Sequence, residues 1–315
     1  MPPFHPHPLL KDGHLQTISG MLGSLPSEQA TRRLVRLPDG DQLIIHDDQP
    51  PNWHPGQRVA LLVHGLCGSF RSAYVVRIAA KLRQHGVRTY RLDMRGCGAG
   101  RGLAHHPYHS GRSDDIRQAL ISLQTWFPAS PQSLIAFSLG ANAALKMLGE
   151  NTAPLPTLLD QAIVVSPPVD LAASVNNLSH YPARAYDRFF TTALLAHVDA
   201  SPTLSERASV IFSRRRPTRL IEFDDAFTAP LSGFRTAANY YKRCSAAQFL
   251  SGIYIPTTIL MAKDDPIVPW EPLVSSRLSS STELLLTDHG GHLGFIAPHR
   301  QRWMDEMVVQ RVIAP

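Results

Sequence analysis

The sequence feature that most constrains the fold is the stretch of residues 133–142, SLIAFSLGAN. Its apolar residues 134–137 predict a short buried strand, and residues 139–148 predict a helix that begins directly after Ser138. Ala136 and Gly140 lie two positions before and after this serine, and both are small. Small residues are needed there because the strand and helix backbones nearly touch at so abrupt a turn. The pattern is that of a nucleophile elbow, which exposes a reactive serine hydroxyl.

The rest of the chain predicts an α/β fold with a mostly parallel central sheet and helices on both faces. Short apolar segments alternate with amphipathic helical patterns, and an apparent hairpin precedes them. We expect a final helix over residues 299–312. The expected strands cover residues 31–37, 42–46, 58–63, 87–92, 134–137, 161–165, 257–261 and 283–286.

Residues 169–250 interrupt this alternation with helical patterns rich in arginine and aromatic residues. We interpret them as a helical lid inserted into a single α/β domain that spans residues 1–315. A chain of 315 residues, 43% of them hydrophobic, is long enough for one such domain with an insertion.

Composition argues against several classes of protein. The net charge is +6, but the only tight basic run is residues 214–216, which is too short to indicate nucleic-acid binding. A weak contact with anionic lipid at the membrane surface is compatible with this charge. We expect no transmembrane segment and no secretory signal. Cys67, Cys97 and Cys244 lack metal-type spacing and predict reduced thiols, so we expect a cytoplasmic protein.

A serine nucleophile needs a base, and the base needs a carboxylate that orients it. The strand expected at residues 257–261 leads into Asp264 and Asp265. These neighbours cannot both face one histidine. We favour Asp265, because Pro266 and the apolar residues after it fix its direction, and we expect Asp264 to cap a turn or face solvent.

The base is expected after the next strand, where His289 and His292 both occur. His292 lies between Gly291 and Gly294, which permit a tight loop reaching back over the sheet, whereas His289 is nearer the strand. We therefore predict a catalytic triad of Ser138, Asp265 and His292, in the chain order of α/β hydrolases.

The developing oxyanion requires backbone N–H donors. We expect one from Leu139, directly after the serine, and the second from Leu66, in the glycine-rich loop of residues 64–69 that follows an apolar strand. That loop could alternatively be a simple strand-to-helix turn.

We expect no cofactor. The glycine-rich residues 93–98 lack the spacing of a dinucleotide site, and we interpret them as a loop at the rim of the site. Histidines at several positions raise the alternative of a metal, which we do not favour, because the chain lacks a helical His-Glu-x-x-His motif. They are His5, His7, His105, His106, His109, His289 and His292.

These motifs together resemble the YheT-like branch of the α/β-hydrolase superfamily, which contains bacterial candidate esterases and eukaryotic membrane-associated esterases and lipases. The resemblance covers nearly the whole chain in the same order. It is carried by residues 8–17 (PLLKDGHLQT), 64–69 (HGLCGS), 95–98 (RGCG), 108–111 (YHSG), 136–140 (AFSLG), 223–228 (FDDAFT), 240–241 (YY), 264–266 (DDP) and 290–295 (GGHLGF).

The resemblance implies the same triad, a carboxylic ester hydrolase acting on acyl esters, and no cofactor. Ala136 stands where the family usually has glycine, and the N-terminal membrane anchor of the eukaryotic relatives is not apparent. Three alternatives stay open: acyl transfer to an alcohol by the same triad, a metal-dependent hydrolase, and a non-catalytic binding protein on this fold.

Overall fold

The computed structural model describes residues 2–22 and 30–314. One eight-stranded sheet forms its centre, with the order β1-β2-β4-β3-β5-β6-β7-β8. The β1–β2 and β2–β4 pairs are antiparallel and the remaining pairs are parallel, which confirms the predicted architecture. The strands are β1 (Thr31–Arg36), β2 (Gln42–Asp48), β3 (Val59–Val63), β4 (Arg88–Asp93), β5 (Gln132–Phe137), β6 (Leu159–Val165), β7 (Thr257–Ala262) and β8 (Thr282–Thr287).

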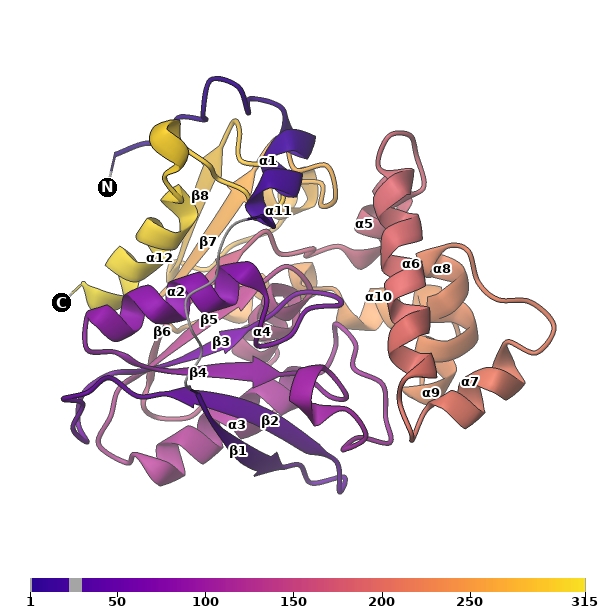
Figure 1. Cartoon of the computed structure of the whole chain (residues 1–315), viewed down its shortest axis with the longest axis horizontal. Coiled ribbons are helices and arrows are strands. Elements are labelled where there is room, and N and C mark those ends of the chain that lie inside the picture. The colour runs from indigo at the N-terminus through magenta and orange to yellow at the C-terminus, as the bar shows by residue number, and fades with distance from the viewer. Residues whose placement is uncertain (1, 23–29, 315) are drawn as a thin grey trace.

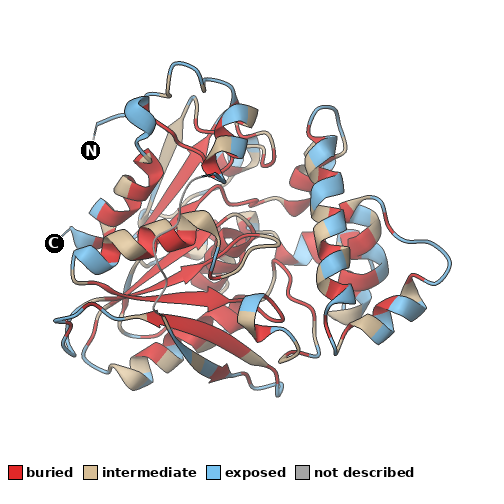
Figure 2. Cartoon of the chain, in the orientation of Figure 1, coloured by how far each residue is buried: buried red, intermediate tan, exposed pale blue. Residues whose placement is uncertain are grey.

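Helices cover both faces of the sheet, because the inner strands are apolar on both sides. In β3 all five residues are buried, and Ala60 and Leu62 pack in one hydrophobic cluster while Leu61 and Val63 pack in the other. The first cluster includes α2 (Ala73–Gln84) and α12 (Trp303–Ile313), and the second includes α3 (Ser113–Trp126) and α4 (Leu139–Gly149). Figure 2 shows the buried residues concentrated along the strands.

Two further elements lie outside this repeating pattern. A short N-terminal helix, α1 (Gly13–Gly20), precedes β1, and α11 (Glu271–Ser275) follows β7. Between β6 and β7 the chain forms a helical insertion, which gathers to one side of the sheet in Figure 1. Its elements are α5 (Leu171–Leu178), α6 (Arg184–Asp199), α7 (Ser205–Ile211), α8 (Leu220–Phe223), the π-helical turn η2 (Asp224–Thr228), α9 (Ala229–Leu231), α10 (Ala237–Cys244) and the 3₁₀ segment η3 (Ala246–Gly252).

The start of the final helix was predicted wrongly. Residues 298–300 form a separate 3₁₀ turn, η4 (Pro298–Arg300), and α12 begins only at Trp303. His299 and Arg300 have φ values of 57° and 59°. This left-handed backbone cannot continue into a right-handed α-helix, so the chain must turn before α12 starts.

The remaining 3₁₀ turn, η1 (Gly98–Gly100), follows β4. Within the described ranges, no helix is both long and apolar enough to span a bilayer. Cys67, Cys97 and Cys244 are all unpaired thiols, and the last two are buried.

Candidate active site

Ser138 occupies the turn between β5 and α4, with φ 52° and ψ −123°. A positive φ is unfavourable for serine and is stabilised here by its surroundings. The Ser138 N–H donates to the Val165 carbonyl at 2.9 Å. A Cβ atom at Gly140 would lie 2.4 Å from the His64 carbonyl oxygen, so only glycine allows α4 to approach β3 so closely.

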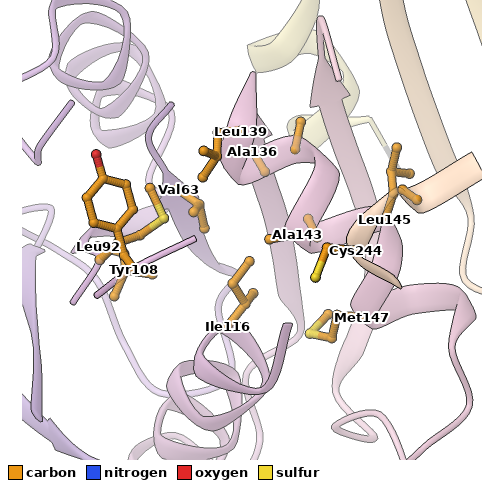
Figure 3. Packing of buried hydrophobic residues seen from close by; sticks show 14 of the residues in the cluster. Val63, Leu92, Tyr108, Ile116, Ala136, Leu139, Ala143, Leu145, Met147 and Cys244 are labelled. Atoms are coloured by element: carbon orange, nitrogen blue, oxygen red, sulfur yellow. The ribbon is translucent and has the colours of Figure 1, made fainter. Parts of the chain in front are cut away.

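Buried apolar side chains pack around this turn. Figure 3 shows Val63 from the end of β3 near Ala136 of β5 and Leu139 at the start of α4. All three belong to the same hydrophobic cluster. The serine itself is half-buried, so its hydroxyl is held in place but remains accessible.

His292 and Asp265 meet Ser138 at the carboxyl end of the sheet. His292 Nε2 lies 2.9 Å from Ser138 Oγ, and His292 Nδ1 lies 2.8 Å from Asp265 Oδ2. The other carboxylate oxygen, Asp265 Oδ1, accepts hydrogen bonds from the N–H groups of Ile267 and Val268 at 2.9 and 3.0 Å. These two bonds fix the direction of the carboxylate, and its side chain is fully shielded from solvent.

Asp264 and His289 form a separate pair in which neither contacts Ser138. Asp264 Oδ1 accepts a hydrogen bond from the Gly291 N–H at 2.8 Å, and Asp264 Oδ2 lies 3.3 Å from His289 Nδ1. Burial raises the pKa of Asp264 above its ordinary value. This carboxyl group therefore anchors the loop that carries His292.

In the loop after β3, the N–H groups on either side of Leu66 already have acceptors. The N–H of Gly65 donates to the Tyr74 hydroxyl at 2.9 Å, and that of Cys67 donates to the Tyr108 hydroxyl at 3.0 Å. Among the described residues, the N–H groups of Leu66 and Leu139 have no acceptor. Both residues line the pocket that also contains Ser138, so these two donors are available to an oxyanion there.

His64 holds this loop from its buried side. The Met94 N–H donates to His64 Nε2 at 3.2 Å, so Nε2 is the unprotonated nitrogen, and Nδ1–H donates to the Gly65 carbonyl at 2.8 Å. Burial lowers the pKa of His64, which keeps the ring neutral. The histidine at the start of the loop is thus a support for the backbone donors.

The helix α1 packs directly on the His292 loop, a role that the sequence analysis did not identify. Thr17 Oγ1 accepts a hydrogen bond from the His292 N–H at 2.8 Å. Gln16 bonds both backbone groups of Ile296, with Nε2 donating to its carbonyl at 3.0 Å and Oε1 accepting from its N–H at 2.7 Å. A Cβ atom at Gly13 would lie 1.9 Å from the Asp264 carbonyl oxygen. The motif in residues 8–17 is therefore part of the site's framework.

Asn142, one turn after Ser138, joins α4 to two other parts of the site and is fully buried. Its Nδ2 group donates to the carbonyls of Ser110 and Cys244 at 3.1 and 2.9 Å. Its Oδ1 accepts from the Ala246 N–H at 3.0 Å. One amide thus fixes the loop around Ser110 and the junction of α10 and η3 relative to α4.

The histidine-rich segments have other partners. Asp39, Asp41 and His106 place possible ligand atoms within 4.8 Å of one another. However, Arg95 Nη1 already contacts Asp39 Oδ2 at 2.7 Å and Asp41 Oδ2 at 2.6 Å, so a guanidinium occupies the position between these carboxylates. His289 and His292 bond different aspartates, as described above. Among the residues that the structure describes, the one group with ligand atoms this close together is thus already paired with an arginine.

The strand order, the turn after β5 and the Ser138–His292–Asp265 contacts define an α/β hydrolase. The fold resembles that of an esterase from Pyrococcus furiosus, Pf2001, with a TM-score of 0.60 and 15% identity over 92% of this chain and 95% of the esterase. The family model described as serine aminopeptidase, S33, matches residues 54–294. This chain therefore belongs to that family of α/β hydrolases.

Two named relatives are more similar in sequence. YheT of Escherichia coli (strain K12), a candidate esterase, is 32% identical over 87% of this chain and 82% of its own length. A monoacylglycerol lipase of Saccharomyces cerevisiae is 29% identical over 82% of this chain, which spans only 60% of the yeast protein. The predicted YheT-like resemblance is thus confirmed, and the family is one of ester-hydrolysing enzymes.

Proposed function

We propose that this protein is a serine carboxylic ester hydrolase that forms an acyl-enzyme on Ser138. The observation that carries the proposal is the continuous contact from Asp265 through His292 to the Ser138 hydroxyl, at 2.8 and 2.9 Å. A serine hydroxyl becomes an effective nucleophile only when a base can remove its proton as it attacks.

In the first step, His292 Nε2 takes the Ser138 proton while Oγ attacks the ester carbonyl carbon. Asp265 accepts the hydrogen bond of His292 Nδ1–H, which selects this tautomer and stabilises the imidazolium. The N–H groups of Leu66 and Leu139 bind the negative oxygen of the tetrahedral intermediate. His292 then donates the proton to the leaving alcohol, and the acyl group remains on Ser138.

In the second step, water attacks the acyl-enzyme while His292 again acts as the base. The carboxylic acid is released and Ser138 regains its proton. If an alcohol replaces water in this step, the product is a new ester. Product analysis with added alcohol distinguishes hydrolysis from acyl transfer.

The helical insertion is proposed to act as a lid. Its helices supply walls of the pocket beside Ser138, including Val175 of α5, Leu194 of α6 and Phe227 of η2. Tyr186 of α6 contacts α1 through a 3.0 Å hydrogen bond between its hydroxyl and His14 Nδ1. A cover of this kind excludes water from the acyl group during the first step.

The test is Ser138→Ala, assayed with p-nitrophenyl butyrate. We expect kcat/KM to fall by about 10³-fold or more. Ser166→Ala is a matched control, because Ser166 follows the neighbouring strand β6, also has a positive φ, and its Oγ has no hydrogen-bond partner among the described residues. That variant should keep its activity. Undiminished turnover by Ser138→Ala would refute the proposal, and loss of activity to a chelator would favour a metal hydrolase instead.

A further inference from the structure

The pocket beside Ser138 lies where the acyl chain of an ester substrate would bind. Ser138, Leu66 and Leu139 line one part of it, and apolar side chains of the insertion line much of the rest. His292 and Asp265 do not contribute to its wall. The leaving alcohol must lie within reach of His292 to be protonated. The acyl chain is therefore the part of the substrate that enters this pocket.

A carboxyl group interrupts the apolar wall of the pocket. Asp224, the first residue of η2, lines it together with Thr228 and Tyr241. Asp224 is only 7% exposed. Its Oδ2 accepts a hydrogen bond from the Tyr241 hydroxyl at 2.8 Å. No basic side chain among the described residues pairs with it.

This environment is costly for a carboxyl group unless it gains another partner. Burial raises the pKa of Asp224 to about 6, and the nearby Asp187 carboxylate adds to this effect. The Tyr241 hydroxyl satisfies only one of the roughly four lone-pair positions of the carboxylate. The π-helical turn that carries Asp224 is a rare geometry, often found at functional sites. A pocket meant only for a hydrocarbon chain would have no need of this group.

We propose that Asp224 binds a hydroxyl group on the acyl chain of the substrate, so that the enzyme prefers hydroxyacyl esters to unsubstituted acyl esters of equal length. The proposal rests on the acyl-enzyme function proposed above. A hydroxyl suits this site because it donates to the ionised carboxylate and accepts from the protonated acid. An unsubstituted chain of the same length leaves the carboxyl without that bond, and a site built around a hydrogen bond discriminates against the analogue that lacks it.

The experiment measures kcat/KM for p-nitrophenyl esters of straight-chain acids of increasing length, each with and without a terminal hydroxyl. Increasing length moves the hydroxyl deeper into the pocket. At one length, the hydroxylated ester should exceed its unsubstituted partner by about tenfold or more. Asp224→Leu should reduce this ratio to about 1. Asp224→Asn, which keeps the shape of the side chain, should lower the ratio by at least about threefold, because hydrogen bonds to a charged acceptor are stronger.

Asp225→Asn is the matched control. Asp225 is adjacent, but its Oδ1 accepts from the Ala237 N–H and it does not line the pocket, so its loss should leave the ratio unchanged. The proposal is overturned if the wild-type ratio stays at or below 1 at every length, or if folded Asp224 variants keep the wild-type ratio. A folded wild type that hydrolyses none of the esters would instead overturn the esterase function itself.

Discussion

The substitution Thr17→Val tests whether α1 positions the catalytic base. Valine has the shape of threonine but removes the only hydrogen-bond acceptor that the described residues offer to the His292 N–H. His292 is buried, so an N–H left without an acceptor costs about 1–3 kcal/mol. If this cost destabilises the loop conformation in which His292 contacts Ser138, kcat drops by about fivefold to 150-fold.

The Michaelis constant should change little, because Thr17 does not line the acyl pocket. We would measure kcat and KM with p-nitrophenyl butyrate and the unfolding midpoint by circular dichroism. Thr17→Ser keeps the hydroxyl and should retain most of kcat, while Ser19→Ala on the same helix is a control away from the His292 N–H. A folded Thr17→Val variant with wild-type kcat would refute this role of α1. A loss in Thr17→Ser with none in Thr17→Val would instead indicate that the methyl group, and not the hydroxyl, supports the loop.

Three further predictions concern the support of the site. Tyr108→Phe removes the acceptor of the Cys67 N–H in the loop that carries Leu66, so kcat should fall about fivefold or more with thermal stability nearly unchanged. A variant with wild-type kcat would show that this bond does not hold the Leu66 N–H in position. Asn142→Ala removes three buried hydrogen bonds and should lower the free energy of unfolding in urea by about 2–4 kcal/mol. Because the pKa of Asp224 is raised from 3.8 to about 6, its contribution to stability should fall by roughly 2 kcal/mol as pH rises from about 4 to 7. Asp224→Asn lacks this titration, so its free energy of unfolding relative to wild type should rise over that range. A difference that does not change with pH would contradict a buried carboxyl with a raised pKa.

The local elements could be predicted because their signals are short-range. The strand and helix around Ser138 follow from adjacent apolar residues and from two small residues beside the serine. The preference for Asp265 over Asp264 rests on the residues that immediately follow it, whose N–H groups bond Asp265 Oδ1. The order and spacing of strands and helices likewise determined the α/β class.

The supports of the site were missed because their partners are distant in the sequence. Thr17 bonds a residue 275 positions away, and the partners of Asn142 lie 32 to 104 positions away. A sequence pattern shows that such a side chain is polar but not which backbone group it satisfies. The early start expected for the final helix had a different cause, because the left-handed backbone at His299 and Arg300 has no glycine to indicate it.

The buried carboxyl in the insertion belongs to the same class of missed feature. In the sequence, the segment 223–228 stands out only through the family resemblance, and nothing local indicates that Asp224 lines the same pocket as Ser138. That relation depends on the packing of η2 and α10 over the sheet, which brings Tyr241 to the carboxyl. Helical patterns predict that such helices exist, but they do not determine which polar side chains face inward.

The most direct test of the central claim is labelling with a fluorophosphonate probe, followed by digestion and mass spectrometry of the modified peptide. Such probes react with a serine only when a neighbouring base activates it. We predict a single adduct on Ser138, abolished in Ser138→Ala and strongly reduced in His292→Ala. An unlabelled folded protein, or an adduct on any other serine, would contradict the proposal that Ser138 is the acyl-accepting nucleophile.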